Sequence, residues 1–296
     1  MKKILITGGA GFVGANCAML ARRQWDVYVT THKTRINPAL PAREVALDIA
    51  DLENVQSVIS RIRPVAIIHA AALSDTRSSA EKPELAMKMN ADGTKNMAIA
   101  AGQYGAKLVY ISTDLVYDGE GSLYSETDTA AASCHYGRSK LAGEEMAIRF
   151  CDNLCIARSA TVYGCNINNK KNFAESLIEK LGSSERVKLF TDEYRSFIHV
   201  QDLCRILLKM AADTKLTGIY NAGGPQRLSR YEFGLELADA FGFDKSLIEP
   251  SKIDPAMFND HRPKDCSMNI SKLTEKIGIS LADVSEGLNA MRRQRA

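Results

Sequence analysis

The chain begins with a short apolar stretch, residues 3–7, that leads directly into a glycine-rich turn. Gly8, Gly11 and Gly14 are spaced three residues apart, and a stretch of helical composition, residues 12–23, begins within the turn. Glycine is required where a turn is tight and where the backbone must come close to a diphosphate. The N-terminus of the following helix then offers unpaired N–H groups to the phosphates. This order of strand, turn and helix predicts a Rossmann-type dinucleotide site, whose contacts in the turn are Gly8, Gly11, Phe12, Val13 and Gly14.

Strands and helices are expected to alternate along the first half of the chain. Apolar runs predict strands at residues 3–7, 25–30, 65–69, 107–112 and 154–158. The stretches between them predict helices at residues 12–23, 51–63, 83–102 and 134–150. Short, continuous apolar strands separated by helices are typical of a parallel sheet that is covered on both faces.

After Gly164 the alternation becomes less regular. Helices are expected at residues 172–181, 201–212 and 229–241, and strands at residues 196–200 and 218–222. We therefore expect an α/β fold, a doubly wound parallel sheet of the Rossmann type with a smaller C-terminal α/β substrate lobe. The boundaries are predicted as 1–164 for the dinucleotide-binding domain and 165–296 for the lobe, with 195–222 partly rejoining the sheet.

Charge, hydropathy and cysteine content exclude several classes of protein. The formal net charge is +3 over 296 residues, which gives no reason to expect nucleic acid or a membrane as a partner. Apart from the N-terminal apolar stretch, the longest apolar run is residues 65–73, which is far too short to cross a bilayer. The seven cysteines include no Cys-x-x-Cys pair and no set at metal-ligand spacing, so no metal site is expected. We interpret them as buried thiols of a protein in the reducing cytoplasm.

The end of the second predicted strand bears on which dinucleotide is bound. An NAD site usually places Asp or Glu about 20 residues after the turn, where it binds the ribose 2′-hydroxyl. Here Thr31, His32, Lys33 and Arg35 stand in a segment without an acidic residue. The three basic side chains could meet a 2′-phosphate, and Thr31 could form a hydrogen bond with it. The sequence therefore favours NADP(H), with NAD(H) as the alternative if these side chains face solvent.

Tyr136 and Lys140 are four residues apart within a predicted helix, so a phenol and an ammonium group share one face. The pKa of a tyrosine is ordinarily about 10. A neighbouring lysine and a positively charged nicotinamide favour the phenolate, which makes proton exchange with a substrate oxygen feasible near neutral pH. Thr113 follows the strand at 107–112, at the carboxyl end where parallel sheets bind ligands. We expect its hydroxyl to hold a substrate carbonyl beside Tyr136.

Taken in chain order, these features resemble the extended short-chain dehydrogenase/reductases. Asp48 and Ile49 are similar to the dipeptide that contacts the adenine in that family. The alanines after His69 are similar to a strand end that lines the cofactor. Residues 90–96 match the family's Asn-x-x-Gly-Thr-x-Asn helix, whose first Asn is structural or relays protons to the lysine. The cofactor contacts expected beyond the glycine turn are Thr31, His32, Lys33, Asp48, Ile49, Ala70, Ala71, Ala72, Asn90, Tyr136 and Lys140.

Within that superfamily, residues 112–119, 158–164 and 262–267 resemble the dTDP-4-dehydrorhamnose reductase branch. The resemblance implies that Thr113, Tyr136 and Lys140 are the catalytic residues. It also implies that Tyr136 protonates the C4 oxygen of a 4-keto-6-deoxy sugar nucleotide while NADPH delivers a hydride to C4. A homodimer is expected on the same ground.

Two arginines are candidates for binding the diphosphate of such a substrate. Guanidinium groups bind phosphate bidentately, which favours Arg195 and Arg262. The alternative is that they form surface salt bridges with nearby acids such as Asp192 and Asp260. The full set of expected substrate contacts is Thr113, Asp114, Ser159, Thr161, Arg195 and Arg262.

Two further functions stay open at this level. Residues 195–202 are nearer the Arg-x-Phe-x-His-Val-x-Asp segment of sugar-nucleotide epimerases and dehydratases, which retain NAD. Dehydratases of this superfamily carry Glu after the Thr-Asp pair, whereas Leu115 stands there in this chain. The same branch includes the regulatory subunit of methionine adenosyltransferase, which implies a non-catalytic NADP-binding subunit as the other alternative.

Overall fold

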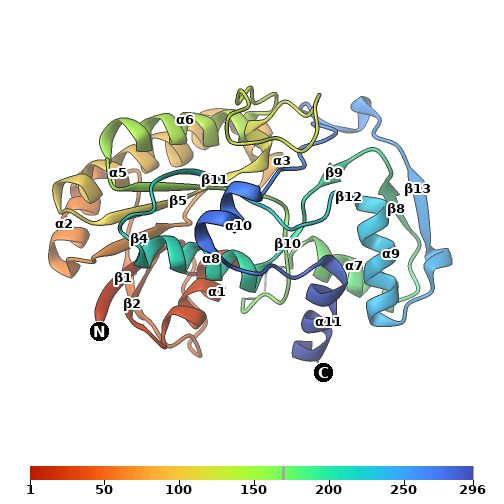
Figure 1. The fold of residues 1–296 in the computed structure, drawn as a ribbon, viewed down its shortest axis with the longest axis horizontal. Helices are drawn as coiled ribbons and strands as arrows, with labels where there is room; N and C mark the ends of the chain where they lie inside the picture. The colour runs from red at the N-terminus through yellow and green to blue at the C-terminus, as the bar shows by residue number, and fades with distance from the viewer. Residues whose placement is uncertain (169–170, 296) are drawn as a thin grey trace.

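The computed structural model of the chain describes residues 1–168 and 171–295. At its centre lies a seven-stranded sheet in the order β11-β6-β5-β4-β1-β2-β3, in which every neighbouring pair is parallel (Figure 1). The strands are β1 (Lys2–Thr7), β2 (Trp25–Thr31), β3 (Arg43–Ala46), β4 (Ala66–His69), β5 (Lys107–Thr113), β6 (Leu154–Ser159) and β11 (Gly218–Ala222). The chain moves outward from β1 in one direction and then, from β4, in the other, so the predicted doubly wound α/β fold is confirmed.

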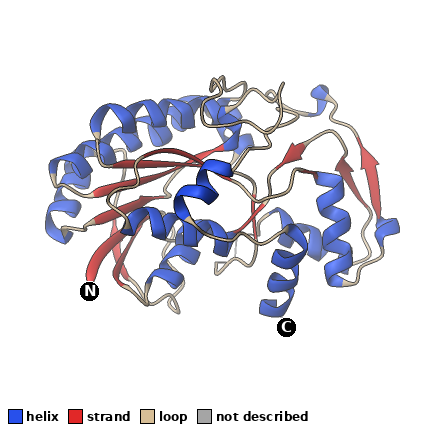
Figure 2. Cartoon of the chain, in the orientation of Figure 1, coloured by secondary structure: helices blue, strands red, loops and turns tan. Residues whose placement is uncertain are grey.

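Two layers of helices cover the sheet, as Figure 1 and Figure 2 show. Successive residues of a strand point to opposite faces. Ile4 and Ile6 of β1 accordingly join the hydrophobic cluster under α1 and α8, whereas Leu5 joins the cluster under α2 and α5. The covering helices are α1 (Phe12–Ala21) and α8 (Val200–Ala212) on one face, and α2 (Leu52–Ile62), α5 (Gly93–Gln103) and α6 (His135–Phe150) on the other.

The single helix predicted at residues 83–102 is wrong in detail. The structure has α4 (Pro83–Met87), a π-helical turn (Lys88–Asp92) and then α5, preceded by the short α3 (Thr76–Glu81). The carbonyl of Asn90 accepts the hydroxyl of Thr94 at 2.6 Å within this stretch. Such π turns inside helices are frequent at functional sites.

Several elements after residue 164 build a third hydrophobic cluster beside the sheet, which includes Phe233, Leu237, Leu177 and Leu288. Its elements are α7 (Phe173–Gly182), β8 (Val187–Phe190), α9 (Arg230–Phe241), β13 (Ile248–Ser251) and α11 (Val284–Arg295). The remaining short elements are β7 (Val162–Tyr163), β9 (Tyr194–Arg195), β10 (Ile198–His199), β12 (Leu228–Ser229) and α10 (Ser271–Ile277). β11 pairs with β6 at one edge of the central sheet. The boundary between the two lobes at residue 164 remains a prediction.

The strand expected at 196–200 forms only over β10, because Val200 already begins α8. By contrast, the predicted helix cap at Ser229 is present: its side chain accepts the N–H of Glu232, and Glu232 returns the contact to the N–H of Ser229. Among residues 1–168 and 171–295, no helix combines the length and the hydrophobicity that a membrane span requires.

Candidate active site

A cavity of about 740 Å³ opens where β5 and β6 end, between the sheet and the C-terminal elements. It is lined by Thr113, Asp114, Tyr136, Thr161, Arg195 and Arg262, all expected from the sequence, together with Cys134, Glu193, Arg230, Phe258 and Asp260, among other residues. Side chains more than 140 residues apart in the sequence thus meet at one place. Of the expected substrate contacts, only Ser159 lies outside the lining, and its hydroxyl donates to the carbonyl of Ala160 at 3.1 Å.

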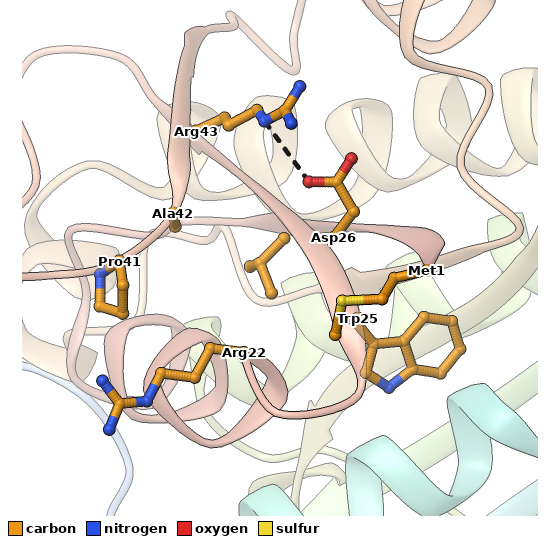
Figure 3. A pocket seen from close by; sticks show the side chains of 8 residues that line it. Met1, Arg22, Trp25, Asp26, Pro41, Ala42 and Arg43 are labelled. Carbon is orange, nitrogen blue, oxygen red and sulfur yellow. Dashed lines mark ion pairs between the residues drawn. The ribbon is translucent and has the colours of Figure 1, made fainter.

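A second hollow of about 580 Å³ lies at the opposite end of the strands (Figure 3). Met1 precedes β1, while Trp25 begins β2 and Arg43 begins β3, so this hollow lies at the amino ends of the strands. Open parallel sheets bind their ligands at the carboxyl ends. We therefore assign function to the cavity beside Thr113 and Tyr136.

The glycine turn has the geometry that a diphosphate requires. Gly8 has a φ of +68°, which side chains rarely adopt, and a Cβ there would lie 2.9 Å from the N–H nitrogen of Ala71. A Cβ at Gly14 would lie 2.2 Å from the carbonyl oxygen of Gly8, so only glycine lets α1 start this close to the turn. Gly11 is the N-cap of α1 and offers no side chain to the first-turn N–H groups. The residues present therefore fit a dinucleotide.

A network around His69 joins the ends of β1 and β4 next to this turn. The hydroxyl of Thr7 lies 2.8 Å from Nδ1 of His69 and accepts the N–H of Ala71 at 3.0 Å. Burial, together with the charge of Lys140, lowers the pKa of His69 to about 3, so the imidazole is neutral and hydrogen-bonded. The network holds the strand end that carries Ala70 and Ala71 against the glycine turn.

Asn90, expected as a cofactor contact, is 1% exposed, and its amide is occupied by the protein itself. Its oxygen accepts the N–H of Leu73 at 2.8 Å, and its nitrogen donates to the carbonyl of Leu73 at 3.1 Å and to the hydroxyl of Ser139 at 2.9 Å. Ser139 lies between Tyr136 and Lys140 on α6. Asn90 therefore positions the helix that carries the two candidate catalytic residues, while a direct contact with a cofactor remains a prediction.

Burial changes the acidity of both Tyr136 and Lys140. Burial raises the pKa of Tyr136, and the charges of Asp114 and Cys134 add to the increase, while a hydrogen bond with Thr113 partly offsets it. Burial lowers the pKa of Lys140 to about 7, although Glu144 opposes the change. Without ligand, the phenol is therefore protonated at neutral pH, while the lysine titrates near that pH.

The arginines of the cavity wall surround one buried carboxylate that the sequence analysis did not identify. Glu193 is 1% exposed and contacts Arg230 Nε at 2.8 Å, Arg262 Nη2 at 2.7 Å and Arg195 Nη2 at 3.4 Å. Burial raises the pKa of Glu193, but Arg230, Arg195 and Arg262 outweigh that effect and lower it to about 2. The carboxylate is therefore ionised at all working pH values.

This cluster corrects the alternative considered for the two predicted arginines. Arg195 and Arg262 both pair with the buried Glu193, and Arg195 also lies 3.6 Å from Asp114, whereas neither arginine pairs with Asp192 or Asp260 within the described residues. Arg195 is 3% exposed, and its Nη atoms donate to the carbonyls of residues 194, 263 and 264. Arg262 packs its guanidinium 4.7 Å from the ring centroid of Phe258. Contact of Arg195 or Arg262 with a diphosphate remains a prediction.

Replacing Glu193 with glutamine is expected to lower the free energy of unfolding by about 3–5 kcal/mol, because it leaves three guanidinium groups without their buried counter-charge. Urea unfolding measures the change. Glu185→Gln is the matched control: Glu185 pairs with Lys180, both side chains are about half exposed, and such pairs contribute less than about 1 kcal/mol. Equal effects of the two substitutions would contradict this account of Glu193.

Residues 257–263, here called the strap, line the cavity and contact the start of α6. Asp260 accepts the N–H of His135 at 2.7 Å and lies 3.1 Å from the Nδ1 of the same histidine. Nδ1 of His261 lies 2.8 Å from the hydroxyl of Ser133. An isolated Asp or His in a loop gives no periodic signal, so sequence reasoning did not assign these contacts.

Some of the residues that were expected to bind a 2′-phosphate lie beside acidic side chains. His32, Lys33 and Arg35 are exposed after β2. The hydroxyl of Thr31, however, donates to Glu44 of β3 at 2.8 Å, and Nε2 of His32 lies 3.9 Å from a carboxylate oxygen of Asp48. Within the described part of the chain, Lys33 and Arg35 form no ion pair, so they are the clearer candidates for binding a 2′-phosphate.

The predicted adenine contacts, Asp48 and Ile49, adopt different environments. Asp48 is partly exposed, and one of its carboxylate oxygens accepts the N–H of Ala50 at 2.9 Å. Ile49 is buried, and its carbonyl accepts the side-chain amide of Asn96 at 2.9 Å. Asn90 of the π-helical turn thus holds the loop that follows β4, and Asn96 of α5 holds the loop that follows β3.

Comparison with known proteins gives consistent matches over the whole chain. A family described as the RmlD substrate binding domain matches residues 1–296. Subunit beta of methionine adenosyltransferase 2 from Danio rerio is 28% identical over 286 residues, which cover 95% of this chain and 86% of that protein. Sequence relatives therefore include a protein named as a subunit.

Two solved structures are similar over nearly their full length. The dTDP-4-dehydrorhamnose reductase from Bacillus anthracis, crystallised in complex with NADP, is 27% identical with a TM-score of 0.85, and the match covers 99% of this chain and 100% of that one. The dTDP-4-dehydrorhamnose reductase ortholog from Clostridium acetobutylicum is 26% identical with a TM-score of 0.87, covering 99% of both chains. The resemblance inferred from the sequence motifs is confirmed.

Proposed function

Because the chain belongs to the RmlD substrate binding domain family, we propose that it is an NADPH-dependent reductase of a 4-keto-6-deoxy sugar nucleotide. One observation carries the proposal: Tyr136 and Thr113 open into the same cavity as a cluster of three arginines. A proton donor at one side and cationic groups at the other suit a carbonyl compound that carries phosphate. The similar structures named dTDP-4-dehydrorhamnose reductase support the choice of substrate class.

The chain's own residues divide the reaction among them. A nicotinamide dinucleotide held at the glycine turn would supply the hydride for C4. Tyr136, whose raised pKa keeps it protonated, donates its proton to the C4 oxygen as charge develops there. Lys140 lies one turn further along α6. In its charged form, Lys140 stabilises the phenolate that remains after Tyr136 has donated its proton. The strap and the buried Glu193 cluster hold the cavity wall against which the remainder of the substrate lies.

The preference for NADPH is assigned to Lys33 and Arg35. Replacing both with alanine is expected to raise the Kd for NADPH about tenfold or more, since hydrogen bonds to a charged phosphate contribute about 1.5–3 kcal/mol each. The Kd for NADH is expected to stay within about twofold of its original value, because NADH has no 2′-phosphate. Fluorescence titration with both nucleotides measures the two constants. Wild-type protein that binds NADH much more tightly than NADPH would contradict the assignment.

The regulatory-subunit alternative is supported by the methionine adenosyltransferase relative. Such a subunit needs the fold and the dinucleotide but no proton donor. Thr113 and Tyr136 line a cavity of about 740 Å³, and Lys140 follows Tyr136 by four residues on α6, which together favour catalysis. An epimerase or dehydratase, the other alternative, would be purified with tightly held NAD. Homodimer formation and a cytoplasmic location remain predictions.

A screen of keto sugar nucleotides tests the proposed function. Purified protein is mixed with NADPH and each compound, and the absorbance of the reduced nicotinamide is followed. We expect oxidation of NADPH with at least one 4-keto-6-deoxy sugar nucleotide and none with the corresponding 4-hydroxy compound. Protein that binds NADPH but oxidises it with no member of the panel would support the subunit alternative instead.

A further inference from the structure

The hydroxyl of Thr113 has one proton, and two titratable oxygens compete for it. Its Oγ1 donates to Oδ1 of Asp114 at 3.0 Å. Oγ1 of Thr113 also accepts the N–H of Leu115 at 3.2 Å. Thr113 and Tyr136 line the same cavity, and the hydroxyl of Thr113 lowers the pKa of the phenol by stabilising its ionised form. Because a hydroxyl donates only once, Thr113 cannot stabilise an ionised Asp114 and an ionised Tyr136 together.

The surroundings of Asp114 let its charge vary. It is 3% exposed, and its Oδ2 has no hydrogen-bond donor among the described residues, with Arg195 Nε at 3.6 Å. Burial raises the pKa of Asp114 to about 6, although Arg195, Thr113 and Arg230 lower it. The other titratable groups that face it from neighbouring elements are Glu193, Tyr136, Cys134 and Cys266.

We propose that Asp114 is a positioning residue that decides where the proton of Thr113 points. The ionised carboxylate accepts the hydrogen bond of that hydroxyl, so Thr113 can only accept from the phenol of Tyr136, which stabilises the protonated phenol. When Asp114 gains a proton from solvent, Thr113 is free to donate to the oxygen that Tyr136 protonates. The consequence for turnover rests on the proposed reductase function, whereas the hydrogen bond between Thr113 and Asp114 does not.

The hydrogen bond is tested without substrate or cofactor. The full-length protein is labelled at the aspartate carboxyl carbons, and their NMR signals are followed against pH. Asp114→Asn identifies the signal of Asp114 by its loss. We expect Thr113→Val to raise the midpoint of that signal by about one pH unit, because the ionised form loses its donor, and Thr113→Ser to leave it nearly unchanged. An unchanged midpoint in Thr113→Val overturns the proposal.

Turnover provides the second measurement. As pH falls through the midpoint of Asp114, kcat of the wild type is expected to rise about fivefold, because Thr113 then donates one additional hydrogen bond to the reacting oxygen. The change in KM is expected to be smaller. Asp114→Asn is expected to lose the step near about pH 6 and to keep any step near about pH 7 that comes from Lys140. A variant that keeps the step near about pH 6 overturns the proposal. If no keto sugar nucleotide is reduced, the proposed function fails, and the NMR titration alone decides whether Asp114 controls Thr113.

Discussion

Replacing Tyr136 with phenylalanine is expected to lower kcat for a keto sugar nucleotide by about 10³-fold, within the range that a general acid contributes. Burial raises the pKa of the phenol, with Asp114 and Cys134 adding to the increase, so the wild-type group carries a proton at neutral pH. Phenylalanine keeps the ring and loses only the hydroxyl. We therefore expect the Kd for NADPH to change by less than about threefold.

Tyr104→Phe is the matched control for this experiment. Tyr104 follows α5, is 39% exposed and lies outside the cavity lining, so its loss of a hydroxyl should leave kcat unchanged. Steady-state rates give kcat, and fluorescence titration gives the Kd. A Tyr136→Phe variant whose kcat stays within tenfold of the wild type would show that another group supplies the proton.

Gly14→Ala is expected to weaken dinucleotide binding by about 100-fold or more, an effect of about 2.7 kcal/mol. The new Cβ would lie 2.2 Å from the carbonyl oxygen of Gly8. The backbone fixes the positions of both atoms, so no rotamer change can move them apart. The start of α1 must shift away from the turn, so its N–H groups no longer reach the phosphates together. Calorimetric titration with NADPH measures the loss.

Gly182→Ala separates this local effect from a general cost of replacing glycine in a helix. Gly182 ends α7, where a Cβ would meet the ring of Phe243 at the ordinary contact distance of 3.8 Å. The control should bind NADPH normally. Circular dichroism should show that Gly14→Ala keeps its helices, since overpacking typically costs about 1–3 kcal/mol. A Gly14→Ala variant with unchanged affinity would place the diphosphate elsewhere.

The parts of the fold that follow from local patterns were predictable. β1, the glycine turn and α1 are consecutive, so the constraint that joins them lies within about twenty residues. The cap of α9 at Ser229 is likewise local. β3 was missed because its four residues are mostly exposed at the sheet edge and carry no apolar run. The π-helical turn was missed because it depends on contacts of Asn90 with Leu73 and Ser139.

The candidate site divides in the same way. Tyr136, Lys140 and Thr113 could be predicted as candidates because the spacing of the first two and the position of Thr113 at a strand end carry information. Glu193 was not, since its partners Arg230 and Arg262 are 37 and 69 residues away and only the fold brings them together. The neighbourhood of Glu44 and Thr31 depends on β3, so the acidic group beside the predicted 2′-phosphate site was also beyond the sequence.

The central claim, that this site is that of a reductase, is tested most directly by deuterium transfer. The cofactor is NADPH that carries deuterium at the transferable position of the nicotinamide. The labelled cofactor is mixed with protein and a dTDP-linked 4-keto-6-deoxy sugar, and the product is examined by mass spectrometry and NMR. We predict a 4-hydroxy sugar nucleotide with one deuterium at C4, formed in step with the oxidation of NADPH. Folded protein that binds NADPH yet leaves the keto sugar unlabelled and unreduced would contradict the assignment of this site as a reductase.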